Sequence, residues 1–167
     1  KVALKSLNKL NLNSVENICE ITEKLLKNII KDQLIADVET GVFLSGGTDS
    51  ALVTAISQEL SKKRISTFSI GFDVKEYDES SDARMIAKTL DTDHKEYIMT
   101  SDDLVNILQS GCLLDEPFYD ISQYPTYLLS KFASKHVRVC LSGDGGDEIF
   151  GGYNRYLIGQ NNYLNLL

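Results

Sequence analysis

The stretch "GVFLSGGTDSALV", residues 41–53, decides the fold expected for this chain. Its apolar run "VFLS" (42–45) is typical of a buried strand, and segment 50–63 has the apolar stripe of a helix. Ser-Gly-Gly joins the two, which is how phosphate-binding loops are usually built. The loop also carries a carboxylate, Asp49, where a Walker-type nucleotide-binding loop has a lysine.

Strand-like and helix-like segments alternate along the rest of the chain, which indicates βαβ units. We therefore predict an α/β fold with a doubly wound, Rossmann-like parallel sheet and helices on both faces. Residues 1–33 are expected to form an amphipathic helix and linker, and 34–167 one nucleotide-binding domain. Helices are predicted at 15–34, 78–90, 101–110 and 124–136, with Ser14 and Ser101 as N-caps, and further strands at 65–72, 95–99 and 137–142.

Composition limits the classes of protein that fit. Hydrophobic residues make up 43% of the 167 positions, yet no apolar run approaches the roughly 20 residues that span a bilayer. The formal net charge of -7 argues against a nucleic-acid partner, because phosphate backbones are bound by clustered Lys and Arg.

The three cysteines, Cys19, Cys112 and Cys140, suit neither a disulfide framework nor a zinc site, and Cys140 is expected in the core. Residues 1–14 lack the features of a secretory signal, so a cytoplasmic location is expected.

A second loop of similar chemistry, "SGDGGDE" (142–148), follows the predicted strand 137–142. Ligands of such sheets bind beyond the carboxyl ends of the strands, so both loops are expected at one site. Glycine backbone amides, the hydroxyls of Ser45 and Ser50 and the following helix N-terminus can bind phosphate without a lysine. Mg²⁺ typically bridges one or two carboxylates and phosphate oxygens, so we predict that Asp49 and Asp147 hold this metal between the loops.

Other interpretations of these loops fit less well. The first loop contains neither G-x-x-x-x-G-K-[ST] nor G-x-G-x-x-G, which disfavours Walker-type and dinucleotide sites. Asp144 and Asp147 are three residues apart, unlike the alternating ligands of an EF-hand. Either loop alone could be a simple turn, since Gly and Asp are common turn residues. Two such loops at the predicted ligand-binding edge argue against that alternative.

Several segments together resemble the synthetase domain of glutamine-dependent asparagine synthetases, an N-type ATP pyrophosphatase with an SGG-x-DS loop. They are "FLSGGTDSALV" (43–53), "FSIGFD" (68–73), "YDESSDARMIAKTLDTDHKEY" (77–97), "DEPFYD" (115–120), "PTYLLSK" (125–131) and "LSGDGGDEIFGGYNRY" (141–156). The resemblance implies ATP and Mg²⁺ as cofactors. It also implies that the aspartate side chain attacks the α-phosphorus of ATP, and that ammonia then displaces AMP from β-aspartyl-AMP.

The resemblance further implies roles for residues at matching positions. Asp49, Ser50 and Asp144 would be catalytic, with Asp144 handling ammonia as a general base or electrostatic guide. Asp147 would bind Mg²⁺ with Asp49, and His94 would be structural. The remaining binding residues would be Ser45, Gly46 and Gly47 at the pyrophosphate, Phe43, Ile70 and Gly71 around the adenosine, Ser142 and Gly143 closing that pocket, and Tyr153 near the intermediate.

The sequence also departs from the family pattern. Asp91 stands where a glycine commonly ends a helix, and we expect it to adopt the left-handed backbone conformation. We expect no glutaminase domain with a nucleophilic N-terminal cysteine within this chain. The sequence stops after "NNYLNLL" (161–167), before the family's basic K-x-x-L-R segment with its phosphate-neutralising lysine. We therefore expect a fragment that turns over poorly alone.

Two alternatives to an asparagine synthetase fragment stay open. A relative could adenylate another carboxylate, as β-lactam synthetases and sugar- or peptide-tailoring enzymes do, with "DEPFYDISQYP" (115–125) shaping the acceptor site. A non-catalytic nucleotide-binding or interaction module could also keep this fold, although its intact loop carboxylates argue against decay. The expected partners are ATP and a small carboxylate, and the intact protein could be a homodimer.

Overall fold

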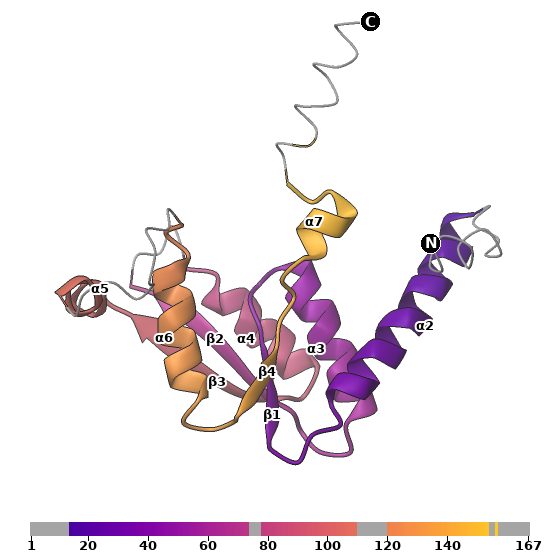
Figure 1. Cartoon of the computed structure of the whole chain (residues 1–167), viewed down its shortest axis with the longest axis horizontal. Helices are drawn as coiled ribbons and strands as arrows, with labels where there is room; N and C mark the ends of the chain where they lie inside the picture. The colour runs from indigo at the N-terminus through magenta and orange to yellow at the C-terminus, as the bar shows by residue number, and fades with distance from the viewer. Residues whose placement is uncertain (1–13, 74–77, 110–119, 154–155, 157–167) are drawn as a thin grey trace, which may run out of the picture.

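A four-stranded parallel sheet with helices on both faces forms the body of the protein (Figure 1). The computed structural model describes residues 14–73, 78–109, 120–153 and 156. The strands are β1 (Thr40–Phe43), β2 (Ser66–Phe72), β3 (Asp93–Met99) and β4 (Val139–Leu141). The helices are α2 (Val15–Gln33), α3 (Thr48–Leu60), α4 (Ser80–Thr89), α5 (Ser101–Gln109), α6 (Gln123–Ala133) and α7 (Gly146–Phe150). The predicted doubly wound α/β class is confirmed.

The strand order β3-β2-β1-β4 reverses direction at β1. The chain passes from β1 to β2 and β3 on one side, and then returns to add β4 on the other side of β1. Thr40 pairs with Val139 and Val42 with Leu141, so β1 and β4 end at nearly the same level. Ligands of doubly wound sheets bind at such a reversal. The loops that follow β1 and β4 therefore begin side by side.

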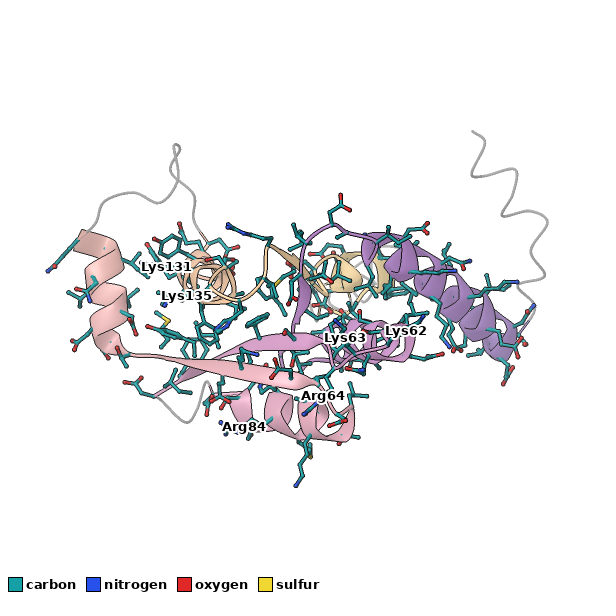
Figure 2. The ribbon with its side chains drawn as sticks, turned by 90° about the horizontal axis from the view of Figure 1, so that it is seen from below. Lys62, Lys63, Arg64, Arg84, Lys131 and Lys135 are labelled. Carbon is teal, nitrogen blue, oxygen red and sulfur yellow. The ribbon has the colours of Figure 1, made fainter. Side chains whose placement is uncertain are left out.

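Helices on opposite faces of the sheet bury separate parts of the core. Figure 2 shows α6, which carries Lys131, and α4, which carries Arg84, on opposite sides of the strands. Helix α2 packs against α3, and the Lys27 ammonium donates to Glu59 across that contact at 2.8 Å. Under α4 the core consists of Leu44, Ala83 and Ala87, under α6 of Phe68, Ala133 and Val137, and between α5 and α6 of Met99, Ile107 and Leu128.

Local hydrogen bonds set where two of the helices begin. Ser14 caps α2 as predicted, because its hydroxyl accepts a hydrogen bond from the Asn17 amide at 3.2 Å. The prediction that Ser101 caps α5 was wrong, because that helix already starts at Ser101. The cap is Thr100, whose hydroxyl accepts from the Asp103 amide at 3.3 Å while the Asp103 carboxylate accepts from the Thr100 amide at 2.9 Å.

None of the helices in the described parts of the chain is both long and apolar enough to cross a membrane.

Asp91 ends the turn after α4 in the left-handed conformation, with φ of 52°, as the sequence predicted. It is the one non-glycine residue with positive φ in the described ranges. A Cβ atom in this conformation costs roughly 1–2 kcal/mol, a cost that Asp tolerates better than most residues. Arg64 donates to the Asp91 carbonyl at 3.0 Å and so holds the turn against the start of β2.

We predict that Asp91→Gly is at least as stable as the parent, whereas Asp91→Ala is less stable than Asp91→Gly by about 1 kcal/mol. Both variants lose the exposed carboxylate, so the comparison isolates the backbone. Urea unfolding monitored by circular dichroism gives the two free energies of unfolding. Equal stability of the Ala and Gly variants would contradict a strained turn.

Cys140 and Cys19 occupy different environments. Cys140 packs against the cluster under α6, and burial raises the pKa of its thiol to about 11. Cys19 is exposed on α2, and Cys112 lies outside the described residues. Because the thiolate is the reactive form, the Cys140 thiol should be unreactive near neutral pH.

We predict that iodoacetamide at pH 8 alkylates Cys19 in the native protein and leaves Cys140 intact. Burial keeps Cys140 both protonated and sterically shielded. Mass spectrometry of peptides from native and urea-unfolded samples measures this, with the unfolded sample as the control in which both react. Equal labelling of the two cysteines in the native protein would contradict the partly buried position of Cys140.

Candidate functional site

The loop after β1 is held together by the hydroxyls of Ser45 and Ser50. The two oxygens lie 2.8 Å apart, and the Ser45 amide donates to the Ser50 hydroxyl at 3.1 Å. The Gly47 amide donates to the Ser45 hydroxyl at 3.2 Å, and the Ser50 hydroxyl lies 3.1 Å from the Gly47 carbonyl. These hydroxyls therefore fix the loop itself. The amides of the first turn of α3 have no acceptor within the helix and so are available as donors to a ligand.

The loop after β4 turns sharply because of one glycine. Gly145 has φ of 93°, a conformation that favours glycine, and it is the N-cap of the short helix α7. The Asp144 amide donates to the Ser142 hydroxyl at 3.1 Å, and the Gly146 amide donates to the Gly143 carbonyl at 3.3 Å. This turn places Asp144 and Asp147 around one cavity.

The two loops touch through glycines. A Cβ atom at position 143 would lie 2.7 Å from the Ser50 amide nitrogen and 3.0 Å from the Asp49 carbonyl carbon. A Cβ atom at position 146 would collide with the Asp49 carboxylate. Only residues without side chains allow the loops to approach this closely. The predicted juxtaposition of Asp49 with the second loop therefore has a direct steric cause.

A cavity of about 920 Å³ opens where the loops meet. Its volume is within the range of sites that hold small molecules and cofactors. Most of the residues that the sequence singled out line it: Phe43, Ser45, Gly47, Asp49, Ser50, Ile70, Ser142, Gly143, Asp144, Asp147 and Tyr153. Their positions around one cavity are compatible with the predicted roles, which stay predictions.

Gly46 and Gly71 do not line this cavity. A Cβ atom on Gly46 would lie 2.9 Å from the Asp82 Cβ, so this glycine lets the start of α4 approach the first loop. A Cβ atom on Gly71 would lie 2.7 Å from the Ile98 side chain. Both glycines therefore affect the site indirectly, because they allow neighbouring elements to pack closely around it.

Sequence reasoning missed several residues of the cavity wall. Ser69 and Phe72 come from β2, and Glu79 immediately precedes α4. Thr126 and Leu129 come from α6. The position of β2 and α6 at the ligand-binding edge is the signal that could have found them. The other lining residues are Leu44, Thr48, Ala83, Asp120, Ser122, Gly145 and Glu148, with the Glu148 carboxylate accepting from the Tyr153 hydroxyl at 2.7 Å.

The cavity wall is strongly acidic. Neither Lys, Arg nor His is among its described residues, and the basic side chains labelled in Figure 2 are not part of it. This lining disfavours a free anion and favours an anion that carries cations. The acidic lining residues are Asp49, Glu79, Asp120, Asp144, Asp147 and Glu148.

Asp49 and Asp147 are the predicted metal ligands. Both line the cavity, from opposite loops, and the Asp147 carboxylate lies directly beside Gly152. Within the described ranges no group of three His, Cys, Asp or Glu side chains is arranged as a complete metal site. Two carboxylates suit Mg²⁺, which usually takes one or two from the protein and completes its shell with water and phosphate.

Comparison with known proteins identifies the family. The family model for asparagine synthase matches residues 22–166. The chain belongs to the asparagine synthase family. A Methanocaldococcus jannaschii protein assigned as asparagine synthetase [glutamine-hydrolyzing] 2 is 40% identical over 146 residues, which cover 86% of this chain. Asparagine synthetase [glutamine-hydrolyzing] 1 of Bacillus subtilis is 32% identical over 160 residues, or 93% of this chain.

These relatives are much longer than this asparagine synthase family chain. The matched region spans 28% of the M. jannaschii protein and 25% of the B. subtilis protein. A solved NH3-dependent NAD synthetase from Campylobacter jejuni has a TM-score of 0.56 at 14% identity, covering 81% of this chain and 60% of that one. An NMN synthetase from Francisella tularensis has a TM-score of 0.54 at 16% identity, covering 82% and 59%. The two structures support the fold alone.

We predict that Gly143→Ala destabilises the protein by about 1–3 kcal/mol, because the added methyl group forces the two loops apart. Gly47→Ala is the matched control, since its Cβ would meet only the Ser45 hydroxyl, at 3.2 Å, and should cost less. Urea unfolding of both variants measures the difference. A Gly143→Ala variant as stable as the control would show that the loops can separate freely.

Proposed function

We propose that this chain is the nucleotide-binding part of an ATP-dependent C–N ligase that converts a carboxylate to an amide. The observation that carries the proposal is the contact between two glycine-rich acidic loops around one cavity, at the point where the sheet order reverses. Membership of the asparagine synthase family supports the same chemistry. The names of the relatives favour aspartate as the acceptor carboxylate and asparagine as the product.

The reaction has two bond exchanges. A carboxylate oxygen of aspartate attacks the α-phosphorus of ATP, and the bond from the α-phosphorus to its bridging oxygen breaks, which releases pyrophosphate and leaves β-aspartyl-AMP. Ammonia then attacks the acyl carbon, the bond from that carbon to the phosphate oxygen breaks, AMP leaves with its electron pair, and the nitrogen loses one proton to give the amide. Asp144 lines the cavity and is the proposed acceptor of that proton or the guide for ammonia.

The chain's own groups orient the nucleotide. The amides at the start of α3, with the positive end of its dipole, bind the pyrophosphate that leaves. Phe43 and Ile70 provide apolar walls for the adenosine. Asp49 and Asp147 would hold Mg²⁺, which when bound neutralises phosphate charge. Without such a cation the six carboxylates of the wall would repel the nucleotide.

A different acceptor carboxylate is the second candidate. Asp120, Ser122 and Thr126 form a wall of the cavity on the side of α6. Asp120 and Ser122 lie within the segment expected to shape acceptor choice (115–125), and Thr126 directly follows it. An acidic Asp120 suits an acceptor that carries a positive charge. Aspartate provides one in its ammonium group, and so do other amino-acid substrates.

We predict that ATP binds in the presence of Mg²⁺ and that Asp49→Asn and Asp147→Asn each weaken this binding about tenfold or more, equivalent to roughly 1.4 kcal/mol. Each substitution removes a charged metal ligand and keeps the shape of the side chain. Isothermal titration calorimetry with and without Mg²⁺ measures the affinities. Asp32→Asn, at an exposed position of α2, is the control and should leave binding unchanged.

Binding that is independent of Mg²⁺, or unaffected by both substitutions, would contradict the metal site. Acceptors are then separated by incubating ATP, ammonia and one amino acid at a time with the protein and measuring pyrophosphate release and the amide formed. Adenylation of another amino acid in preference to aspartate would favour the second candidate. Poor turnover by this chain alone is expected, whereas binding of ATP with no turnover by the full-length protein would favour a nucleotide-binding module.

A further inference from the structure

The carboxylate of Asp78 joins the end of β2 to the start of α4. Its Oδ1 atom accepts from the Phe72 amide at 3.3 Å and from the Ser80 amide at 3.1 Å, and its Oδ2 atom accepts from the Ser80 hydroxyl at 3.0 Å. Phe72 is the last residue of β2, and Ser80 is the first residue of α4. One side chain thus bridges two elements of the fold, and we call these three hydrogen bonds the Asp78 clamp.

The groups that donate to Asp78 need an acceptor at this place. Ser80 is 1% exposed, and a buried hydroxyl is rarely left without a partner. Glu79, the N-cap residue of α4, makes no side-chain cap hydrogen bond, so the Ser80 amide is satisfied by Asp78 instead. Because hydrogen bonds from Ser80 and then from Phe72 favour the charged form, the pKa of the Asp78 carboxyl lies below its usual value. The clamp is therefore ionised at neutral pH.

The elements that the clamp joins are walls of the cavity. Phe72 and Ile70 both line the cavity and pack against the same cluster, so they lie on one face of β2. Glu79 lines the cavity from the position between Asp78 and Ser80. Loss of the clamp would therefore free two parts of the wall at once, namely the end of β2 and the start of α4.

The first loop rests on the same helix start. A Cβ atom on Gly46 would lie 2.9 Å from the Asp82 Cβ and 3.6 Å from the Glu79 Cβ. The Asp82 amide donates to the Glu79 carbonyl at 3.1 Å, so both residues belong to the beginning of α4. The start of α4 thus touches the loop proposed to bind pyrophosphate, and the clamp ties it to the strand whose Ile70 is proposed to contact the adenosine. The position of α4 therefore sets the distance between the two halves of the nucleotide site.

We propose that Asp78 is a positioning residue for the nucleotide: its clamp holds α4 against the end of β2 and so keeps the first loop and the adenosine wall at the separation that ATP requires. This role rests on the proposed function, because the nucleotide has to bind in this cavity. Asp78 itself does not line the cavity, so it acts through Phe72, Glu79 and the first loop. The role requires hydrogen-bond acceptors in the right place and does not require a negative charge.

Substitutions at Asp78 separate the position of its acceptors from its charge. In Asp78→Asn the amide oxygen can keep both bonds from the backbone amides, and the amide nitrogen can donate to the Ser80 hydroxyl. Asp78→Ala loses all three contacts. Isothermal titration calorimetry with ATP in the presence of Mg²⁺ measures the affinities. We expect Asp78→Ala to bind about tenfold more weakly than the parent or worse, and Asp78→Asn to stay within about threefold of it.

Asp103 provides a matched control on α5. Its carboxylate also accepts three hydrogen bonds, from the amide and the hydroxyl of Thr100 at 2.9 Å each and from the Tyr97 hydroxyl at 2.7 Å. Asp103 does not line the cavity. We expect Asp103→Ala to lower the free energy of unfolding as Asp78→Ala does, and to leave the affinity for ATP unchanged. Urea unfolding monitored by circular dichroism gives both stabilities and shows that each variant is folded before titration.

Amide hydrogen exchange followed by NMR tests the clamp without any ligand. The Phe72 and Ser80 amides should exchange about tenfold faster or more in Asp78→Ala than in the parent, because they lose their acceptor. In Asp78→Asn they should keep rates close to those of the parent. Unchanged exchange at both amides in Asp78→Ala would overturn the clamp.

An affinity for ATP that Asp78→Ala leaves unchanged, or that Asp103→Ala lowers equally, would overturn the positioning role even if ATP binds as proposed. Binding by Asp78→Asn as weak as that of Asp78→Ala would assign the effect to charge and would also overturn it. If the parent binds no ATP, the proposed function fails and the positioning role fails with it. Hydrogen exchange still decides whether the clamp exists in that case, so the two failures are distinguishable.

Discussion

The site depends on how closely the backbone at Gly143 approaches the Ser50 amide. Parallel pairing of β1 with β4 starts the two loops at one level, and the absence of a side chain at Gly143 and Gly146 lets them touch. The Asp49 carboxylate is thereby pressed against the second loop, which also carries Asp147. Everything assigned to the cavity follows from this contact, because its walls come from both loops and from the strands that they follow.

The acidic wall determines what such a cavity can bind. Six carboxylates without a basic partner in the described wall produce a potential that repels free phosphates. The partial positive charge at the start of α3, equivalent to about half an elementary charge, is too small to offset them. On the proposed function, the ligand is therefore a nucleotide with its metal ions, and cations belong to the substrate complex. A lysine in the loop would reduce that requirement, which is why Asp49 and a Walker-type lysine represent different solutions to phosphate binding.

The spacing of apolar residues and the positions of turn-forming residues made much of this structure predictable from the sequence. The strand–loop–helix unit around residues 41–53, the doubly wound class and the left-handed Asp91 depend on local rules that single segments obey. The Thr100 cap was missed because serine and threonine are equally suitable N-cap residues. Only the position at which the helix starts shows which of the two is the cap. Ser69 was missed because it carries no motif of its own and reaches the cavity only through the position of β2 at the ligand-binding edge. Partners brought together by tertiary packing leave no local signal.

Shape and charge thus have different origins in this site. The hydroxyls of Ser45 and Ser50 are engaged within their own loop, so the loop keeps its shape before any ligand arrives. Preorganised amides at the start of α3 then contribute to binding without a cost of reordering. The described wall, by contrast, contains no basic side chain, so on the proposed function cations accompany the nucleotide. On the proposed function, a ligand must therefore match the shape of this loop and bring cations that offset the acidic wall.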